Sequence, residues 1–304
     1  MLIAMDHGNK QCKLVRSAPF ISGLTESEVR PFGPDVLKYK EKYYQISGQR
    51  IPYRRDKTED DRFFILTLFG IANEIEAAGA YAPGIMRVQL AVGLPPAHYG
   101  AQHEKFTQYF FRRGVVSFTY RGKPYSISID DVACYPQSYA AAVSMLQTLT
   151  AVPLALVVDI GGYTMDYIRI KKGRSDLASC DSLENGVIML YNNIISKVRA
   201  AQDILLSEEE IDAILLGQSV QGVQEVVPVV ERCAQEFVSD LLSALRERQL
   251  ELRTAPVVFV GGGSILLKRH IEKSGKVAHP LFVEDIRANV KGYETLYRIA
   301  QNSR

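Results

Sequence analysis

The sequence predicts an α/β protein built from two related halves. Two stretches share one pattern, in which an apolar strand ends in an aspartate, one further residue and a glycine. The first is residues 2–9, LIAMDHGN, and the second is residues 154–164, LALVVDIGGYT. They lie half a chain apart, and a third apolar strand, residues 257–260, runs directly into three glycines. A repeat with a period of half the chain favours two domains.

Composition excludes several classes of protein. Of the 304 residues, 47% are hydrophobic and 23% are charged, which is ordinary for a globular protein. The formal net charge of +2 is too small to predict direct DNA binding. No run approaches the roughly 18 apolar residues of a membrane helix, and no targeting segment is visible. We therefore expect a cytoplasmic protein without a membrane partner.

No zinc-type metal site is predicted. The cysteines stand far apart without C-x-x-C spacing, which indicates reduced, mostly buried thiols. His98 and His103 are five residues apart and have no acidic partner placed to complete a site, so both are predicted to be surface histidines. The four cysteines are Cys12, Cys134, Cys180 and Cys233.

Each strand-to-glycine corner has the properties of a phosphate and metal site. Glycines let backbone amides turn toward an anion without a Cβ in the way. Asp6 and Asp159 would sit at the ends of their strands, facing a ligand. A single Asp-x-Gly also occurs in ordinary turns, so the repetition carries the inference. Together the three corners predict a nucleotide cleft between two related halves.

The residues after the first corner predict a tight hairpin. Residues 10–15 alternate as a strand does, which pairs them with the strand that ends at Asp6. Lys13 can then point back to the turn, where its ammonium would meet β- and γ-phosphates. A solvated surface lysine is the alternative, and the repeat favours the phosphate role.

The remainder of the first half predicts an irregular segment followed by alternating helices and strands. Residues 17–61 are polar and aromatic and indicate a small irregular subdomain. Apolar residues at three- and four-residue spacing predict a helix over about 63–78. Residues 88–92 predict a strand that stops at glycine and proline, and a helix follows.

A glutamine stands at the next strand-to-helix corner. Residues 126–135 predict a strand, after which Ser138 would cap a helix running to Leu149. Gln137 lies between them, and a neutral amide there could orient a water for attack on a phosphoryl group. A solvated loop glutamine is the alternative, and local sequence alone favours it.

The second half predicts a return strand and then helices. Residues 165–170 would pair with the second corner's strand, and a helix over about 182–200 would carry Glu184 in its first turn. Ser207 opens a capping box, and an amphipathic helix over about 229–249 completes this part.

These motifs resemble those of a known superfamily. The resemblance is to the phosphate-1, connecting, phosphate-2 and adenosine motifs of the actin, Hsp70 and sugar-kinase superfamily. Within it, the chain looks like the bacterial ParM-type actin-like proteins, which are ATPases that polymerise to segregate plasmids. The residues that carry the resemblance are Asp6-x-Gly8 with Lys13, Tyr135-Pro136-Gln137-Ser138, Asp159-Ile160-Gly161-Gly162-Tyr163-Thr164, Gly261-Gly262-Gly263, and the segments 56–61, 93–95 and 288–293.

The resemblance implies two RNase H-like domains, each a mixed five-stranded sheet flanked by helices, around a nucleotide cleft. Domain I would span about 1–145, with a small subdomain at about 17–61 and the C-terminal helix of about 288–304 returning to it. Domain II would span 146–287, with a helical subdomain at about 182–250.

It also implies roles for single residues. Asp6 and Asp159 would hold hydrated Mg²⁺, and Gln137 would position the attacking water, so Gln137 and Asp159 are the catalytic candidates. Many ParM-type proteins carry Glu at the position of Gln137. The predicted ATP-binding residues are Asp6, Gly8, Asn9, Lys13, Gly161, Gly162, Tyr163, Thr164, Glu184 for the ribose, and Gly261, Gly262 and Gly263 near the adenosine.

Three functional classes share such a cleft: a filament-forming ATPase, a small-molecule or sugar kinase or phosphatase, and an Hsp70-type chaperone. A kinase needs a base, and Gln137 cannot accept a proton at neutral pH. An Hsp70 needs a separate peptide-binding domain. We therefore expect an ATPase that assembles with itself into filaments, with an adaptor protein on a centromere-like plasmid DNA site as a further partner. The base pocket leaves ATP and GTP both open.

Overall fold

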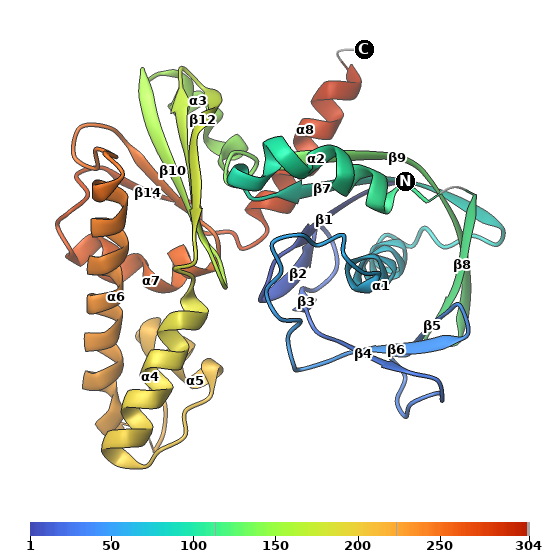
Figure 1. Cartoon of the computed structure of the whole chain (residues 1–304), viewed down its shortest axis with the longest axis horizontal. Coiled ribbons are helices and arrows are strands. Elements are labelled where there is room, and N and C mark those ends of the chain that lie inside the picture. The colour runs from blue at the N-terminus through green and yellow to red at the C-terminus, as the bar shows by residue number, and fades with distance from the viewer. Residues whose placement is uncertain (113, 223, 303–304) are drawn as a thin grey trace. The chain divides into compact units, whose positions relative to one another are not determined.

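The structure is a computed structural model that describes residues 1–112, 114–222 and 224–302. These residues form two compact units, Met1–Val143 with Arg287–Arg304, and Ser144–Ile286 (Figure 1). Each unit has its own sheet and its own apolar core. Among the described residues, no helix is long and apolar enough to cross a membrane. All four cysteines carry free thiols.

The first unit contains one nine-stranded sheet. Its strands are β1 (Leu2–His7), β2 (Gln11–Leu14), β3 (Phe20–Ile21), β4 (Leu24–Ser27), β5 (Leu37–Tyr39), β6 (Lys42–Ile46), β7 (Ile85–Leu94), β8 (Val115–Tyr120) and β9 (Lys123–Pro136). Their order is β3-β2-β1-β7-β9-β8-β5-β6-β4. β1 runs antiparallel to β2 and parallel to β7, which is itself parallel to β9. The carboxyl ends of β1, β7 and β9 therefore meet at one edge.

Helix α1 (Arg62–Ala77) is enclosed by this sheet. Figure 1 shows the strands curling round the helix, from β1 and β2 past β9 and β8 to β5, β6 and β4. All residues from Phe63 to Ala72 are buried, which is the pattern of a helix covered on every side. The predicted helix is present, and its surroundings explain why it is apolar all round.

The two faces of β1 meet different helices. Ile3 and Met5 point into the core built round α1, whereas Ala4 joins a smaller cluster with helix α8 (Ala288–Asn302). Side chains alternate along a strand, so Asp6 shares the face of Ala4 and His7 shares the face of Met5. Helix α2 (Pro96–Phe110) sends Phe106 and Phe110 into the α1 core.

The second unit contains a five-stranded sheet. Its strands, in the order β12-β11-β10-β13-β14, are β10 (Leu154–Ile160), β11 (Met165–Lys171), β12 (Arg174–Leu183), β13 (Val257–Val260) and β14 (Pro280–Phe282). The helices that pack on one face of this sheet share its apolar core, and Figure 1 shows α4, α5 and α6 extending together from it. These helices are α4 (Val187–Gln202), α5 (Glu208–Leu215), α6 (Val227–Glu247) and α7 (Gly262–Lys273). The short helix α3 (Leu146–Thr150) precedes β10 and contributes no residue to this core.

The two sheets share one topology. In each, the first three strands form an antiparallel meander, and two further strands add in parallel beside the first. The predicted pair of mixed five-stranded sheets flanked by helices is confirmed. In the first unit, four more strands extend the sheet beyond β9.

Three details of the sequence prediction are wrong. The helix expected from residue 182 begins at Val187, because β12 runs to Leu183 and Gly186 is the N-cap. The helix expected after Ser138 is a 3-10 helix, Ala141–Met145, followed by the short α3. His98 is buried rather than exposed, with Arg55 Nε 3.4 Å from its Nε2. The predicted capping box at Ser207 is confirmed.

Candidate functional site

The corner at the end of β1 brings three predicted residues together. Asp6 is only 2% exposed and lies opposite Lys13 in the β1–β2 register. Lys13 Nζ is 3.5 Å from Asp6 Oδ2, and Gln137 Nε2 donates a hydrogen bond to Asp6 Oδ1 at 2.8 Å. Lys13 therefore points back to the turn, and Gln137 is a buried group rather than a solvated loop residue.

Two carbonyls of the turn after β1 are held by hydrogen bonds, which fixes the direction of the amides that follow them. The His7 carbonyl accepts a hydrogen bond from Lys57 Nζ at 2.5 Å, and the Gly8 carbonyl accepts one from Ser22 Oγ at 2.5 Å. In a planar trans peptide the N–H points opposite to the C=O. The amides of Gly8 and Asn9 thus face away from Lys57 and Ser22, as donors for an anion.

His7 anchors this turn as a neutral group. Its ring is fully buried and stacks on Phe110, with centroids 5.0 Å apart. Thr67 Oγ1 donates to the Phe63 carbonyl, so it accepts from His7 Nε2 at 2.8 Å, and the Nε2–H tautomer follows. Burial, with a contribution from the charge of Lys57, lowers the pKa of His7 to about 3. His7 is therefore uncharged at neutral pH.

Lys57 is a residue of this corner that the sequence motifs did not predict. Its ammonium is buried against the His7 carbonyl and lies 5.4 Å from the centre of the Phe63 ring. It arrives from an irregular segment whose residues follow no strand or helix period. No local pattern could therefore have linked it to a turn fifty residues earlier.

The corner at the end of β10 directs three consecutive amides to one side. The carbonyls of residues 161–163 accept hydrogen bonds from the amides of residues 186–188 at 2.9–3.1 Å. Because these peptides are planar and trans, the amides of residues 162–164 point away from α4. The first donors of α4 are thus occupied by the turn, and the turn's own amides are the ones presented to an anion.

Two buried carboxylates face each other beside this turn. Asp159 and Asp166 are 6% and 4% exposed and lie directly opposite in the β10–β11 register, so their side chains share one face of the sheet. Thr164 Oγ1 donates to Asp166 Oδ2 at 3.0 Å. Asp166 was absent from the predicted site, although strand alternation and the hairpin register could have placed it there. It occupies the position that Lys13 has opposite Asp6.

The third corner lies against Asp159. Gly261 has φ +87°, and a Cβ on it would lie 2.2 Å from Asp159 Oδ1. A Cβ on Gly263 would lie 2.6 Å from Ile160 Cγ2, whereas no described heavy atom lies within 4 Å of one on Gly262. The β13–α7 corner therefore packs on the end of β10, and Gly262 borders open space. Glu184 is exposed in the connection between β12 and α4, and its ribose role stays a prediction.

The acidic groups suit a hydrated magnesium ion rather than a metal held by protein alone. Within residues 1–112, 114–222 and 224–302, no group of three or more His, Cys, Asp or Glu side chains is arranged to hold a metal. Mg²⁺ usually keeps several waters and binds one or two carboxylates together with phosphates. Asp6 in the first unit, and Asp159 with Asp166 in the second, are donors of this kind.

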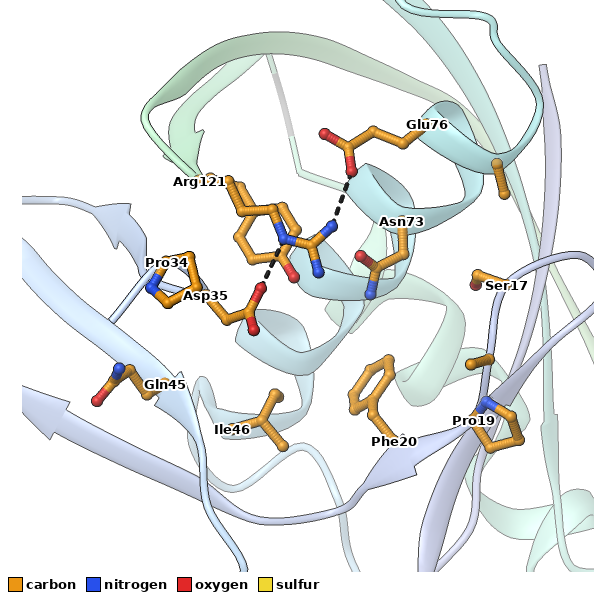
Figure 2. Close-up of a pocket in the computed structure, with 13 residues that line it drawn as sticks. Ser17, Pro19, Phe20, Pro34, Asp35, Gln45, Ile46, Asn73, Glu76 and Arg121 are labelled. Carbon is orange, nitrogen blue, oxygen red and sulfur yellow. Dashed lines mark hydrogen bonds and ion pairs between the residues drawn. The ribbon is translucent and has the colours of Figure 1, made fainter. Parts of the chain in front are cut away.

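A separate hollow in the first unit has a different chemistry. It measures about 640 Å³ and has Phe20 and Ile46 in its wall. Figure 2 shows Arg121 reaching Asp35 at 2.6 Å and Glu76 at 3.1 Å across it. Two carboxylates against one guanidinium disfavour a triphosphate there, and the predicted phosphate residues lie elsewhere.

Comparison with known proteins agrees with this architecture. Residues 4–139 match the family described as the N-terminal domain of actin-like proteins. Residues 157–273 match the family described as archaeal actin homologue MreB-like, C-terminal. No curated protein sequence matches the chain.

Solved structures show the same fold at low identity. Ta0583, an archaeal actin homologue, is 19% identical with a TM-score of 0.75, over 98% of this chain and 99% of that one. Bacillus thuringiensis ParM with ATP is 11% identical with a TM-score of 0.70, over 99% of each chain. The Alp12 filament structure is 16% identical with a TM-score of 0.65, over 98% of each chain.

The fold and its paired corners define an actin-like protein, and the chain belongs to that family. Among the solved structures with this fold are those of ParM proteins, which are 11–15% identical to the chain.

Proposed function

We propose that the protein binds ATP with Mg²⁺, hydrolyses it and assembles into filaments. The observation that carries the proposal is the turn of residues 161–164, in which three amides point away from α4 beside Asp159. Consecutive amides of this kind bind phosphate oxygens, and a neighbouring carboxylate binds the waters of the metal. Ta0583 has been solved with ADP, and Bacillus thuringiensis ParM with ATP, which supports a nucleotide ligand.

Each corner has its own part in nucleotide binding. Lys13 and the amides of Gly8 and Asn9 bind phosphate from the first unit, and residues 162–164 do so from the second. Asp6 and Asp159 hold Mg²⁺ through its waters. Glu184 contacts the ribose, and Gly261, Gly262 and Gly263 border the adenosine, where only Gly262 has open space around it.

Gln137 favours hydrolysis over transfer to a substrate hydroxyl. Its Nε2 donates to Asp6, which leaves Oε1 as the end that accepts a hydrogen bond from a water. An amide can orient a water in this way, but it cannot take the proton of a sugar hydroxyl at neutral pH. A water-positioning role therefore fits the geometry better than a kinase does.

The proposal of self-association rests on the family and on one solved structure with the same fold. Alp12 has this fold, and its structure is that of a filament. We propose that ATP favours the filament and that hydrolysis weakens it. A nucleotide can shift the equilibrium between monomer and filament only to the extent that it binds one of these states more tightly. The ParM type suggests plasmid DNA segregation in the cytoplasm through an adaptor protein bound to DNA.

Light scattering with pelleting tests this function. Mg²⁺ with ATP or a non-hydrolysable analogue should sediment the protein, and ATP filaments should decay as phosphate is released. GTP in a parallel series measures base preference. A protein that stays monomeric with every nucleotide, yet consumes ATP when small-molecule hydroxyl compounds are added, would instead be a kinase.

A further inference from the structure

A buried asparagine near the start of α8 fixes the backbone that carries Gln137. Ser138 N–H donates a hydrogen bond to Asn289 Oδ1 at 3.0 Å, although the two residues are 151 positions apart. We propose that Asn289 is a positioning residue for Gln137, and that its loss slows hydrolysis without weakening nucleotide binding. This inference rests on the proposed ATPase function.

The link between Asn289 and Gln137 is a single peptide group. The N–H of Ser138 lies in the same plane as the carbonyl of Gln137. Asn289 therefore holds one side of this plane, while the Gln137 carbonyl on the other side accepts from Tyr139 N at 2.5 Å. Gln137 N in turn donates to the Leu94 carbonyl at 2.8 Å. The backbone on both sides of Gln137 is thus fixed.

The conformation held in this way is one that serine disfavours. Ser138 has φ +61°, in the left-handed region that is uncommon for residues other than glycine. It is fully buried, and its Oγ has no hydrogen-bond partner among the described residues, so its own side chain does not secure the turn. Such a backbone persists only where its surroundings determine it, and the Asn289 amide is one of those surroundings.

Helix α8 packs closely on the segments that flank Gln137. A Cβ on Gly292 would lie 1.9 Å from the Ala140 carbonyl oxygen, so the helix backbone lies directly on the segment after Gln137. Tyr293 fills the space beside Gly93, where a Cβ would lie 2.2 Å from its ring. All these residues belong to the first unit. These contacts hold α8 against the segments on either side of Gln137, and they place Asn289 beside the Ser138 amide.

The direction of the Gln137 side chain depends on this backbone. Its Nε2 reaches Asp6 Oδ1 at 2.8 Å, and Oε1 is the end proposed to hold the water. If the peptide between residues 137 and 138 rotates toward an ordinary conformation, the amide leaves this position. The groups proposed to bind phosphate in the first unit, which are Lys13 and the amides of Gly8 and Asn9, are not part of that peptide.

The test compares Asn289→Ala and Asn289→Asp, each alone and combined with Gln137→Ala. Asn289→Ala should lower kcat about tenfold with the nucleotide Kd within about twofold of wild type. Asn289→Asp keeps an acceptor oxygen and should recover most of the rate. In the Gln137→Ala background, Asn289→Ala should cause no further loss, because the two residues act as one unit. Thr295→Ala, an exposed site on the same helix, controls for changes in α8.

The outcomes separate this inference from the proposed function. A wild-type protein without ATP turnover would overturn both. Wild-type turnover with an unchanged Asn289→Ala rate, or an equal loss in both backgrounds, would overturn only the positioning role. A parallel fall in affinity, or a loss that Asn289→Asp does not repair, would make Asn289 a packing residue of α8. Urea unfolding of each variant verifies that the compared proteins are folded.

Discussion

Gln137 Nε2 donates to Asp6 Oδ1 at 2.8 Å, which joins the ends of two strands that are not neighbours in the sheet. Asp6 ends β1 and Gln137 follows β9, with β7 between them. All three strands are parallel, so their carboxyl ends share one edge, where ligands of open α/β sheets bind. The same Asp6 carboxylate also faces Lys13. One buried carboxylate thus orients both the proposed phosphate ligand and the proposed water-holding amide.

Asp159→Ala should abolish Mg²⁺-dependent turnover while the fold survives. The loss should be at least about 100-fold, or about 2.7 kcal/mol in barrier, because metal coordination on the second unit is removed. Stability should not fall, since Asp159 faces Asp166 and the change removes a like-charge contact. Phosphate release and urea unfolding are the measurements. Asp176→Ala, an acid paired with Lys171 in the same sheet, is the matched control, and equal activity in the two variants would refute the assignment.

Two neighbouring glycines should respond differently to alanine. Gly261 has φ +87° and ψ 162°, a region open essentially to glycine alone, and its Cβ would strike Asp159. Gly261→Ala should therefore lower the free energy of unfolding by about 1–3 kcal/mol. It should also weaken nucleotide binding. Gly262→Ala has room and should leave stability unchanged. If Gly262 borders the adenosine, its variant should still bind nucleotide more weakly. Equal unfolding free energies for the two variants would contradict this account.

His7 should make stability depend on pH below neutrality. Its pKa is about 3 in the folded protein because burial disfavours the charged ring, against about 6.5 when unfolded. Above pH 6.5 the ring is neutral in both states and has no effect. Between pH 6.5 and 3 only the unfolded state takes up the proton, so the folded state loses up to about 1.4 kcal/mol per pH unit.

Urea unfolding at pH 7, 6 and 5 measures this slope. His7→Gln removes the titrating ring, and its amide can still donate to Thr67. The variant should lose less stability between pH 7 and pH 5 than wild type does. His98 and His270 also have lowered pKa values through burial, and they cancel in the comparison because both proteins carry them. Parallel curves for the two proteins would show that His7 does not titrate in this way.

The sequence predicted those parts of the site that lie on regular hairpins. Strand alternation decides which residue faces which, so the sequence pattern alone places Lys13 opposite Asp6. The same argument applied to the second hairpin would have yielded Asp166. The two related halves followed from the repeated corners, because a strand and a glycine turn are both local signals. The five-stranded sheets followed from the family resemblance that these corners support.

The parts of the site that the sequence did not predict depend on contacts between residues that are far apart in the chain. Lys57 reaches the first turn from an irregular segment, and Asn289 meets Ser138 from the other end of the chain. Strand β12 was missed because it lies at the edge of its sheet, where RSDLASCDSL has no need of an apolar alternation. Three of the four strands that extend the sheet beyond β9, namely β4, β5 and β6, were missed because they are short and lie in residues 17–61, whose composition indicated irregular structure.

Gln137→Ala tests the central claim most directly, with ATP affinity, phosphate release and the decay of filament scattering followed in parallel. A water-positioning amide acts in the transition state and little in the ground state, so affinity should stay nearly unchanged. Phosphate release should fall at least about tenfold, about 1.4 kcal/mol in barrier, and filaments should form and persist longer than wild type. Phosphate release and filament decay at wild-type rates would contradict the account, and a matching loss of affinity would make Gln137 a ligand-binding group instead.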